Sequence, residues 1–477
     1  MKAPFSPYLD SIASGMKALT DILSRSFDYV SILSTDSVGF QISISQRSKR
    51  VSGTNMTTER GSVVRVCRGG QYSEYAFNQI PERIEDLADE ILRELERQFA
   101  LMALTGVKAF DTPLPEDEPL ELFVEKETGR LPETEDMQAL VETFTRLSDR
   151  GMEIIPRALD CMLNASSTHI SKMFITKNRF LRQSYVYTEG ACAAYAPTDA
   201  GEIKFAYDGV SGCCGPEVLE GLKEVLESTP KVMEELLSSE KVVPGEYEII
   251  TDPGISGLIA HEAFGHGVEM DMFVKKRALG EEYIGKRVGS ELCTMHEGAL
   301  CAESVTAYVF DDEGTLAGDV IEIDRGILKA GICDVLSALR LGVKPTGNGK
   351  RENFAHKAYT RMTNTVFDSG DSTLEEMVAS VKHGYLLKGT ESGMEDPKHW
   401  GIQCIMSRGY EIRDGVFTGK VVSPVVMTGY VPDLLGNISM ASTDRRIDGN
   451  GGCGKGHKEW VKVADGGPYL KTKARLG

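Results

Sequence analysis

The chain has 477 residues, of which 26% are charged, and its formal net charge is -18 at pH 7. This length exceeds one ordinary hydrophobic core and predicts two domains, and the acidic balance argues against a nucleic-acid partner because a phosphate backbone would be repelled. No apolar run reaches about 18 residues and residues 1–6 lack a signal-peptide core, so we expect no membrane partner and a cytoplasmic location.

Residues 1–240 predict an N-terminal α+β domain in which helices cover a sheet. Hydrophobic periodicity predicts helices over 7–26, 81–102 and 217–239, and strands over 39–45, 62–67, 74–77, 172–175 and 182–187. Residues 111–135 are rich in proline and acidic side chains, which predicts a linker or an exposed excursion.

Residues 241–477 predict a second, β-rich domain. The expected strands are 247–250, 304–310 and 320–323, and residues 400–426 predict a meander with a turn at 414–415. A capping box at 372–375 predicts the start of a helix that ends near Gly384. Since strands and helices do not alternate regularly, the expected fold class is α+β.

The segment 252–266, with the sequence DPGISGLIAHEAFGH, predicts a short helix that carries chemistry. Asp252 is a good N-cap and Pro253 a good first helical residue. His261 and His266 are five residues apart, whereas the histidines of the zinc-binding H-E-x-x-H pattern are four apart and share a face. On a regular helix the five-residue spacing rotates one imidazole from the other by about 140°. A π-bulge near Gly265 would bring the two rings together.

Glu262 and His266 interrupt the apolar stripe of this helix, and a carboxylate there is costly unless it is paired or lies near a cation. The alternative interpretation is that both histidines are satisfied core residues and that Glu262 forms a salt bridge. A catalytic zinc requires three protein ligands. The candidates for the third are Glu269, Asp271, His296 or a thiol.

The ten cysteines are scattered without a C-x-x-C pair, which is typical of reduced cytosolic thiols. Cys453 lies in the glycine-rich segment 448–457, where a chain can approach a metal closely. Lys455 and Lys458 would favour its thiolate. The alternative is a surface turn with an incidental free cysteine.

Together, the segments His261-Glu262-Ala263-Phe264-Gly265-His266-Gly267 and Cys453-Gly454-Lys455 resemble the TldD/PmbA (TldE) family of peptidases. The resemblance includes residues 361–364 and 370–376. It covers the chain well from about Gly245 onward and covers the N-terminal half more loosely. Because the chain has the histidine-glutamate motif, it resembles the TldD type rather than the partner type that lacks it. At the cysteine loop the family pattern is similar to C-G-K-x-G-Q, from which His457 departs.

The resemblance implies a zinc-dependent metallopeptidase with His261, His266 and Cys453 as metal ligands and Glu262 as general base. It also implies hydrolysis of unfolded or small peptides, modified ones included, inside a homodimer or a heterodimer with a PmbA/TldE-type partner. Two alternatives stay open. One is a cysteine hydrolase in which Cys453 is the nucleophile and His457 or His261 its base. The other is a non-catalytic metal-binding scaffold that Glu269 or Asp271 closes as fourth ligand.

Overall fold

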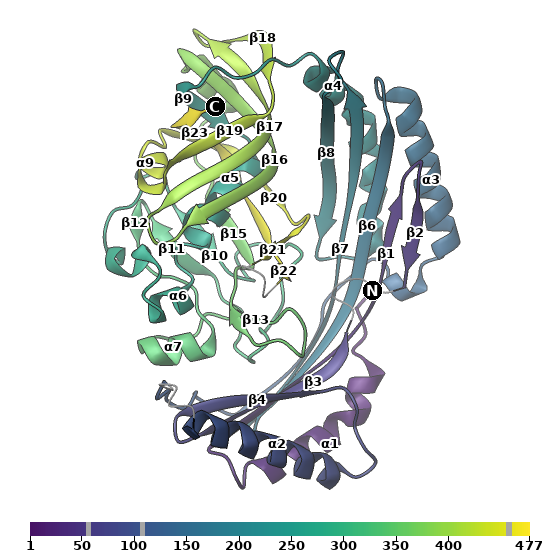
Figure 1. Cartoon of the computed structure of the whole chain (residues 1–477), viewed down its shortest axis with the longest axis vertical. Coiled ribbons are helices and arrows are strands. Elements are labelled where there is room, and N and C mark those ends of the chain that lie inside the picture. Colours follow the sequence, from purple (N-terminus) through teal and green to yellow (C-terminus); the bar gives the residue numbers. More distant parts are fainter. Residues whose placement is uncertain (54–58, 105–109, 455–459) are drawn as a thin grey trace.

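The computed structural model describes residues 1–53, 59–104, 110–454 and 460–477. Two large sheets organise these residues, one of eight strands from the N-terminal half and one of eleven from the C-terminal half (Figure 1). The predicted α+β class with a β-rich C-terminal part is therefore confirmed. Within the described ranges, no helix combines the length and apolarity needed to cross a membrane.

The N-terminal sheet has the strand order β4-β3-β1-β6-β7-β5, with β2 added to β1 and β8 added to β7. Its strands are β1 (Tyr29–Ile44), β2 (Lys49–Ser52), β3 (Arg60–Arg68), β4 (Gln71–Phe77), β5 (Leu120–Glu125), β6 (Asp160–Ile175), β7 (Arg179–Pro197) and β8 (Ile203–Gly212). Its helices are α1 (Pro7–Leu23), α2 (Ile84–Leu104), η1 (Pro132–Thr134), α3 (Met137–Ile154), η2 (Pro216–Gly221) and α4 (Leu222–Leu237).

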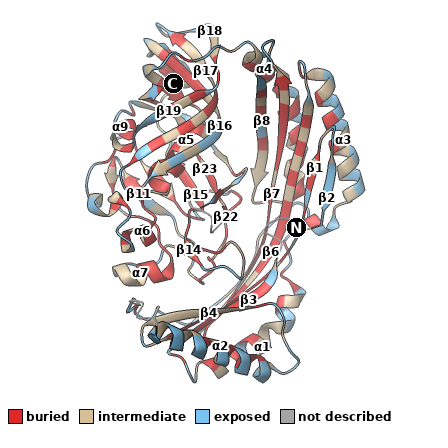
Figure 2. Ribbon diagram, viewed as in Figure 1, coloured by how far each residue is buried: buried red, intermediate tan, exposed pale blue. Residues whose placement is uncertain are grey.

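Separate helix pairs cover the two ends of this long sheet. One core packs apolar residues of α1 and α2 against β1, β3 and β6, and another packs α3 and α4 against β1, β6, β7 and β8. Figure 2 shows buried positions running along β6 and β7, which pair over sixteen consecutive residues. Among the described strands β8 pairs only with β7, so it forms an edge of the sheet, on the side of the C-terminal half (Figure 1).

The C-terminal sheet has the order β12-β11-β10-β15-β23-β19-β17-β16-β9, with β18 added to β17, β20 added to β23 and β23 also paired with β9. Its strands are β9 (Gly245–Thr251), β10 (Met295–Glu297), β11 (Val320–Asp324), β12 (Ile327–Leu328), β15 (Asn364–Phe367), β16 (His383–Asp396), β17 (Gly401–Arg413), β18 (Val416–Val422), β19 (Val425–Tyr430), β20 (Met440–Asp448) and β23 (Ala464–Leu476). Two small hairpins join β13 (Gly349–Lys350) to β14 (Tyr359–Thr360) and β21 (Gly452–Gly454) to β22 (Trp460–Lys462).

The C-terminal helices are short. They are α5 (Pro253–Ala260), the π-helical turn η3 (His261–Gly265), α6 (Met270–Val274), η4 (Leu279–Tyr283), α7 (Val335–Leu341), α8 (Leu374–Ala379) and α9 (Val431–Gly436). The helix α5 follows β9 directly and buries Ile255 and Ile259 in the core of the C-terminal sheet. This packing fixes the start of the histidine segment on the sheet.

One predicted strand is wrong, since residues 304–310 form a loop. Their alternating apolar side chains pack on the N-terminal sheet, with Val305 and Tyr308 in one cluster and Phe310 in another. The backbone bonds of this loop are local or go to side chains: the Ala317 N–H donates to the Val309 carbonyl at 2.9 Å, and Gln183 Nε2 donates to the Phe310 carbonyl at 2.7 Å.

The acidic, proline-rich segment is also more ordered than predicted, because β5 lies within it and pairs parallel to β7. The capping box begins one residue later than expected, at Thr373, and its helix ends at Ala379. The turn at 414–415 is confirmed, but residues 400–426 form a long hairpin rather than a meander, because β18 and β19 both pair with β17. The change of sheet falls between Gly212 and Gly245. The domain boundary at 240/241 stays a prediction.

Candidate metal centre

The predicted distortion of the histidine helix is present. Asp252 Oδ1 accepts a hydrogen bond from the Ile255 backbone N–H at 2.9 Å and caps α5. The turn that follows is π-helical, and the backbone N–H of His266 donates to the carbonyl of His261 at 3.0 Å. This five-residue hydrogen bond brings the two imidazoles face to edge, with ring centroids 5.0 Å apart. The prediction of a π-bulge is confirmed.

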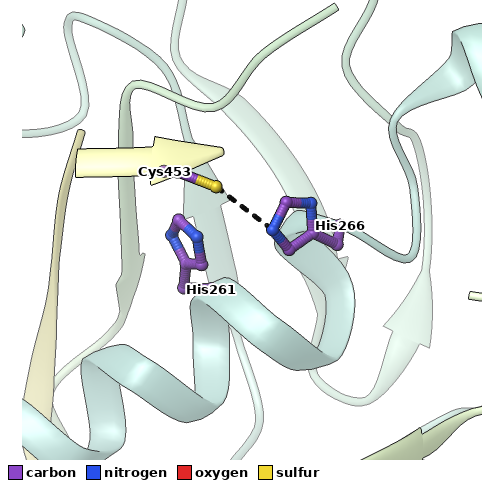
Figure 3. Close-up of side chains that lie close together, drawn as sticks. All are labelled: His261, His266 and Cys453. Atoms are coloured by element: carbon purple, nitrogen blue, oxygen red, sulfur yellow. Dashed lines mark hydrogen bonds between the residues drawn. The ribbon is translucent and has the colours of Figure 1, made fainter. Parts of the chain in front are cut away.

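Cys453 reaches the two histidines from β21, almost two hundred residues further along the chain (Figure 3). Its Sγ lies 3.3 Å from His266 Nε2, and one ligand atom from each of His261, His266 and Cys453 lies within 4.8 Å of the others. Two imidazole nitrogens and a thiolate are a donor set that suits zinc. The geometry can therefore hold a metal ion.

The electrostatics of the cluster also fit a cation. Burial raises the pKa of Cys453, but its contacts with His261 and His266 outweigh burial and bring this pKa down to about 5. Burial lowers the pKa of His266, and its contacts with Cys453 and Glu269 reverse that shift. The Nδ1 atom of His261 is buried without a hydrogen bond to any described residue. The Cys453 thiolate and the two imidazoles thus form a cluster in which a bound cation would be stabilised.

Glu269 does not belong to the cluster of candidate ligand atoms, but it contacts one of the candidate ligands, His266. Its Oε2 lies 3.2 Å from His266 Nδ1, and its Oε1 lies 3.5 Å from the guanidinium Nε of Arg361. Arg361 is fully buried and its Nη2 donates to the Cys453 carbonyl at 3.0 Å. Ligand side chains held by such partners keep their orientation. No sequence pattern indicates this role of Arg361 beyond the resemblance of residues 361–364.

The other candidate ligands lie elsewhere. Asp271 Oδ2 accepts from Lys275 Nζ at 2.8 Å, and the two ring nitrogens of His296 lie 2.8 Å from Asp319 and 3.4 Å from Asp368. Among the described residues, the cluster that could hold a metal contains only the two motif histidines and Cys453. Three residues named from the sequence, Lys455, His457 and Lys458, lie outside the described residues.

Glu262 is buried beside the cluster, with 7% of its surface exposed. Burial raises its pKa and the nearby His261 and His266 lower it, with a net shift upward. A methyl group at Gly393 of β16 would lie 2.6 Å from Glu262 Cγ. A side chain larger than that of glycine would therefore displace the Glu262 side chain. The carboxyl is therefore held next to the candidate ligands with a pKa moved toward neutrality.

A cavity of about 1000 Å³ adjoins the cluster. Glu262 and the three cluster residues line it, together with Phe205 and Tyr207 of β8 and residues 390–395 of β16. Glu395 belongs to this lining, and burial raises its pKa to about 9. Both sheets thus contribute to one cavity that is large enough for several amino-acid residues.

Known proteins share both the sequence pattern and the fold. Residues 244–473 match the family model described as PmbA/TldA metallopeptidase C-terminal domain. The metalloprotease TldD homologue of Buchnera aphidicola from Acyrthosiphon pisum is 35% identical over 241 residues, which are 50% of this chain and 49% of that protein. A metalloprotease of Synechocystis is 27% identical over 451 residues, 94% of each chain.

The alignments with several curated relatives span only 49% to 60% of the length of those proteins. The crystal structure of TldE from Thermococcus kodakarensis covers 97% of this chain and is itself covered completely, with a TM-score of 0.75 at 16% identity, which shows a common fold. From the matched C-terminal domain, the TldD relatives and this shared fold, the chain belongs to the TldD/PmbA family.

Proposed function

We propose that this chain is a zinc-dependent metallopeptidase in which His261, His266 and Cys453 bind the metal and Glu262 is the general base. The observation that carries the proposal is the approach of two imidazoles and a thiol to within 4.8 Å beside a buried carboxyl. Relatives named metalloproteases support the same activity. Three protein ligands leave a position open, as a catalytic zinc requires.

When bound, zinc would supply Lewis acidity for the scissile carbonyl and for a water molecule. Glu262 takes the proton of the attacking water and transfers it to the leaving amine. Its raised pKa suits this exchange, because a general base works best with a pKa near the working pH. Glu269 and Arg361 hold His266 and the Cys453 backbone in place, and so keep the ligands oriented.

The cavity wall favours an extended peptide as substrate. The part of β16 that lines the cavity pairs with β17 on one side, whereas β9 pairs only with its beginning, Gly384 to Leu387. No other described strand pairs with this part of β16. Such an edge can hydrogen-bond the backbone of an added strand regardless of its side chains. We expect unfolded or small peptides, modified ones included, to bind there.

A dimer is part of the proposal, either with a second copy or with a PmbA/TldE-type partner, as the family resemblance implies. A monomeric mass at micromolar concentration in light scattering would count against it. The cytoplasmic location also stays a prediction, because it depends on the sequence alone.

One observation favours a cysteine hydrolase as second candidate, namely the contact of 3.3 Å between Cys453 Sγ and His266 Nε2 together with the low pKa of the thiol. A metal chelator would leave that enzyme active. It would also give Glu262 no part in the reaction, although this carboxyl lies buried beside the thiol.

The scaffold alternative requires a fourth protein ligand. Glu269 and Asp271 were the candidates, and neither belongs to the cluster of ligand atoms among the described residues. The scaffold would bind metal stoichiometrically and hydrolyse no peptide.

The deciding experiment is Glu262→Gln, which keeps the shape of the side chain and removes the base. We expect kcat to fall by about 10²- to 10⁴-fold while the zinc content stays that of the wild type. Activity of the variant equal to that of the wild type would overturn the assignment of Glu262. If the wild type stayed active after its zinc was removed by a chelator, the cysteine hydrolase would be favoured over the metallopeptidase.

A further inference from the structure

The described lining of the active-site cavity is acidic. It contains no lysine or arginine, whereas six of its residues carry carboxyl groups: Glu262, Glu269, Glu391, Glu395, Asp448 and Asp465. A cavity lined by one sign of charge concentrates ligands of the opposite sign. The distribution of these carboxyl groups decides where such a ligand would bind.

Four of the six carboxyl groups either contact a neighbouring protein group or are exposed to solvent. Glu269 supports His266, Asp448 accepts a hydrogen bond from the Asn450 backbone N–H at 2.9 Å, and Asp465 lies 4.0 Å from His261 Nδ1. Glu391 is exposed, and so its carboxyl can be solvated by water. Two groups are left beside the reacting centre, Glu262 as the proposed base and Glu395.

Glu395 is the unusual member of this set. Both of its carboxylate oxygens are shielded from solvent, and neither has a hydrogen-bond partner among the described residues. It follows Gly393 by two positions in β16, so both residues belong to the face of the strand that meets Glu262. A buried carboxyl without a partner costs free energy that a cationic group would recover.

The other side chains of the cavity suit a cation as well. Phe205 and Tyr207 lie side by side on β8, with ring centroids 6.0 Å apart, and Trp460 of β22 lines the same space. Tyr207 and Trp460 are more than 40% exposed. Aromatic faces attract ammonium groups. Carboxyl groups and aromatic rings around one cavity are the combination that binds a protonated amine.

We propose that Glu395 is a specificity-determining residue that receives a protonated amino group of the substrate. The amino group is either the α-ammonium at the N-terminus of a peptide or the side chain of a lysine. The inference depends on the proposed function only for the peptide nature of the substrate. Glu395 takes no part in the proton transfers of Glu262.

A binding measurement tests this inference separately from the proposed function, because it does not require hydrolysis. Calorimetry with the zinc-loaded Glu262→Gln protein would compare four short peptides of one sequence, with lysine or norleucine at one internal position and with a free or acetylated N-terminus. We expect the peptide that retains the recognised amino group to bind at least tenfold more tightly than its neutral counterpart. The pair that shows the difference identifies the source of the amine. Hydrolysis of the same peptides by the wild type tests the proposed function independently.

Adding Glu395→Gln should reduce this preference to less than twofold. The matched control is Asp396→Asn, which likewise replaces a carboxyl group by an amide, one residue along the strand, where the side chain is 52% exposed and bonded to His399. This control should keep the preference. Equal binding of all four peptides to the Glu262→Gln protein would overturn the inference, and so would an equal loss of preference in both added variants.

Discussion

The backbone N–H of His266 donates to the carbonyl of His261, and this hydrogen bond of 3.0 Å closes a π-helical turn instead of an α-helical one. The extra residue rotates His266 back toward His261, so that both rings face Cys453. With the two histidines five residues apart, the site therefore requires the π turn. The geometry of the metal centre depends on the residues that allow the π turn.

Gly265 is one of these residues, because a methyl group there would lie 2.2 Å from Sδ of the buried Met362. We expect Gly265→Ala to shift the π turn, to weaken zinc binding at least tenfold and to cost about 1–3 kcal/mol of unfolding free energy. Competition with a chromogenic chelator measures the affinity. Gly254→Ala is the control on the same helix, since its nearest contact would be 3.7 Å. Unchanged affinity in Gly265→Ala would contradict this role.

Gly393 controls the position of the proposed base rather than the metal. A methyl group there would lie 2.6 Å from Glu262 Cγ and 2.8 Å from Leu258 Cδ1. We expect Gly393→Ala to lower kcat by about 10-fold or more through displacement of the base, at unchanged zinc content. In Gly401→Ala, on the neighbouring strand, the methyl group would meet nothing within 4 Å, and kcat should stay unchanged. Loss of zinc from Gly393→Ala would argue for a general distortion instead.

Arg361 should matter to both stability and metal binding. Arg361→Met removes the buried guanidinium between Glu269 and the Cys453 carbonyl, and removing one partner of a buried ion pair costs about 3–5 kcal/mol. We also expect zinc affinity to fall by about 10- to 100-fold. Arg60→Met breaks a pair in which Arg60 is 56% exposed and should cost less than about 1 kcal/mol. Denaturant titrations of the two variants would show equal losses if Arg361 were unimportant.

His296 provides a test of stability against pH away from the metal cluster. Its contacts with Asp368 and Asp319 raise its pKa from 6.5 to about 9. A raised pKa means that the folded state binds the proton more tightly, so this stabilisation is complete below about pH 6.5 and is lost as the pH rises through 9. Since the partners are 44% and 45% exposed, we expect a contribution on the order of 1 kcal/mol.

His296→Gln should therefore lower the unfolding free energy at pH 6 and change it little at pH 10. The control is His399→Gln, whose histidine is 71% exposed and should contribute little at either pH. A loss from His296→Gln that is the same at both pH values would contradict the ion-pair explanation.

The sequence predicted the parts of the site that depend on local spacing. The cap at Asp252, the helix and its distortion before His266 follow from residues within one segment, and the structure has all three. Cys453 could be joined to them only through the family resemblance, because its place in β21 depends on the pairing of β21 with β22 and not on the histidine segment.

Contacts between distant segments account for what the sequence did not predict. The loop at 304–310 has the alternation of a strand, but its apolar side chains are buried by the N-terminal sheet, and Gln183 forms hydrogen bonds with the backbone of Val309 and Phe310. Glu269 was a candidate ligand because it follows the motif, whereas Arg361, 92 residues away, makes it a support for His266. No local pattern carries that information.

The most direct test of the account is the zinc content of purified wild type, Cys453→Ser and Cys213→Ser, measured by elemental mass spectrometry at equal protein concentration. Cys213 is a free, partly exposed cysteine outside the cluster and serves as the control. We expect about one zinc per chain in the wild type and in Cys213→Ser, and a loss of zinc in Cys453→Ser. Zinc retained in Cys453→Ser at the wild-type level would contradict a site built from both segments.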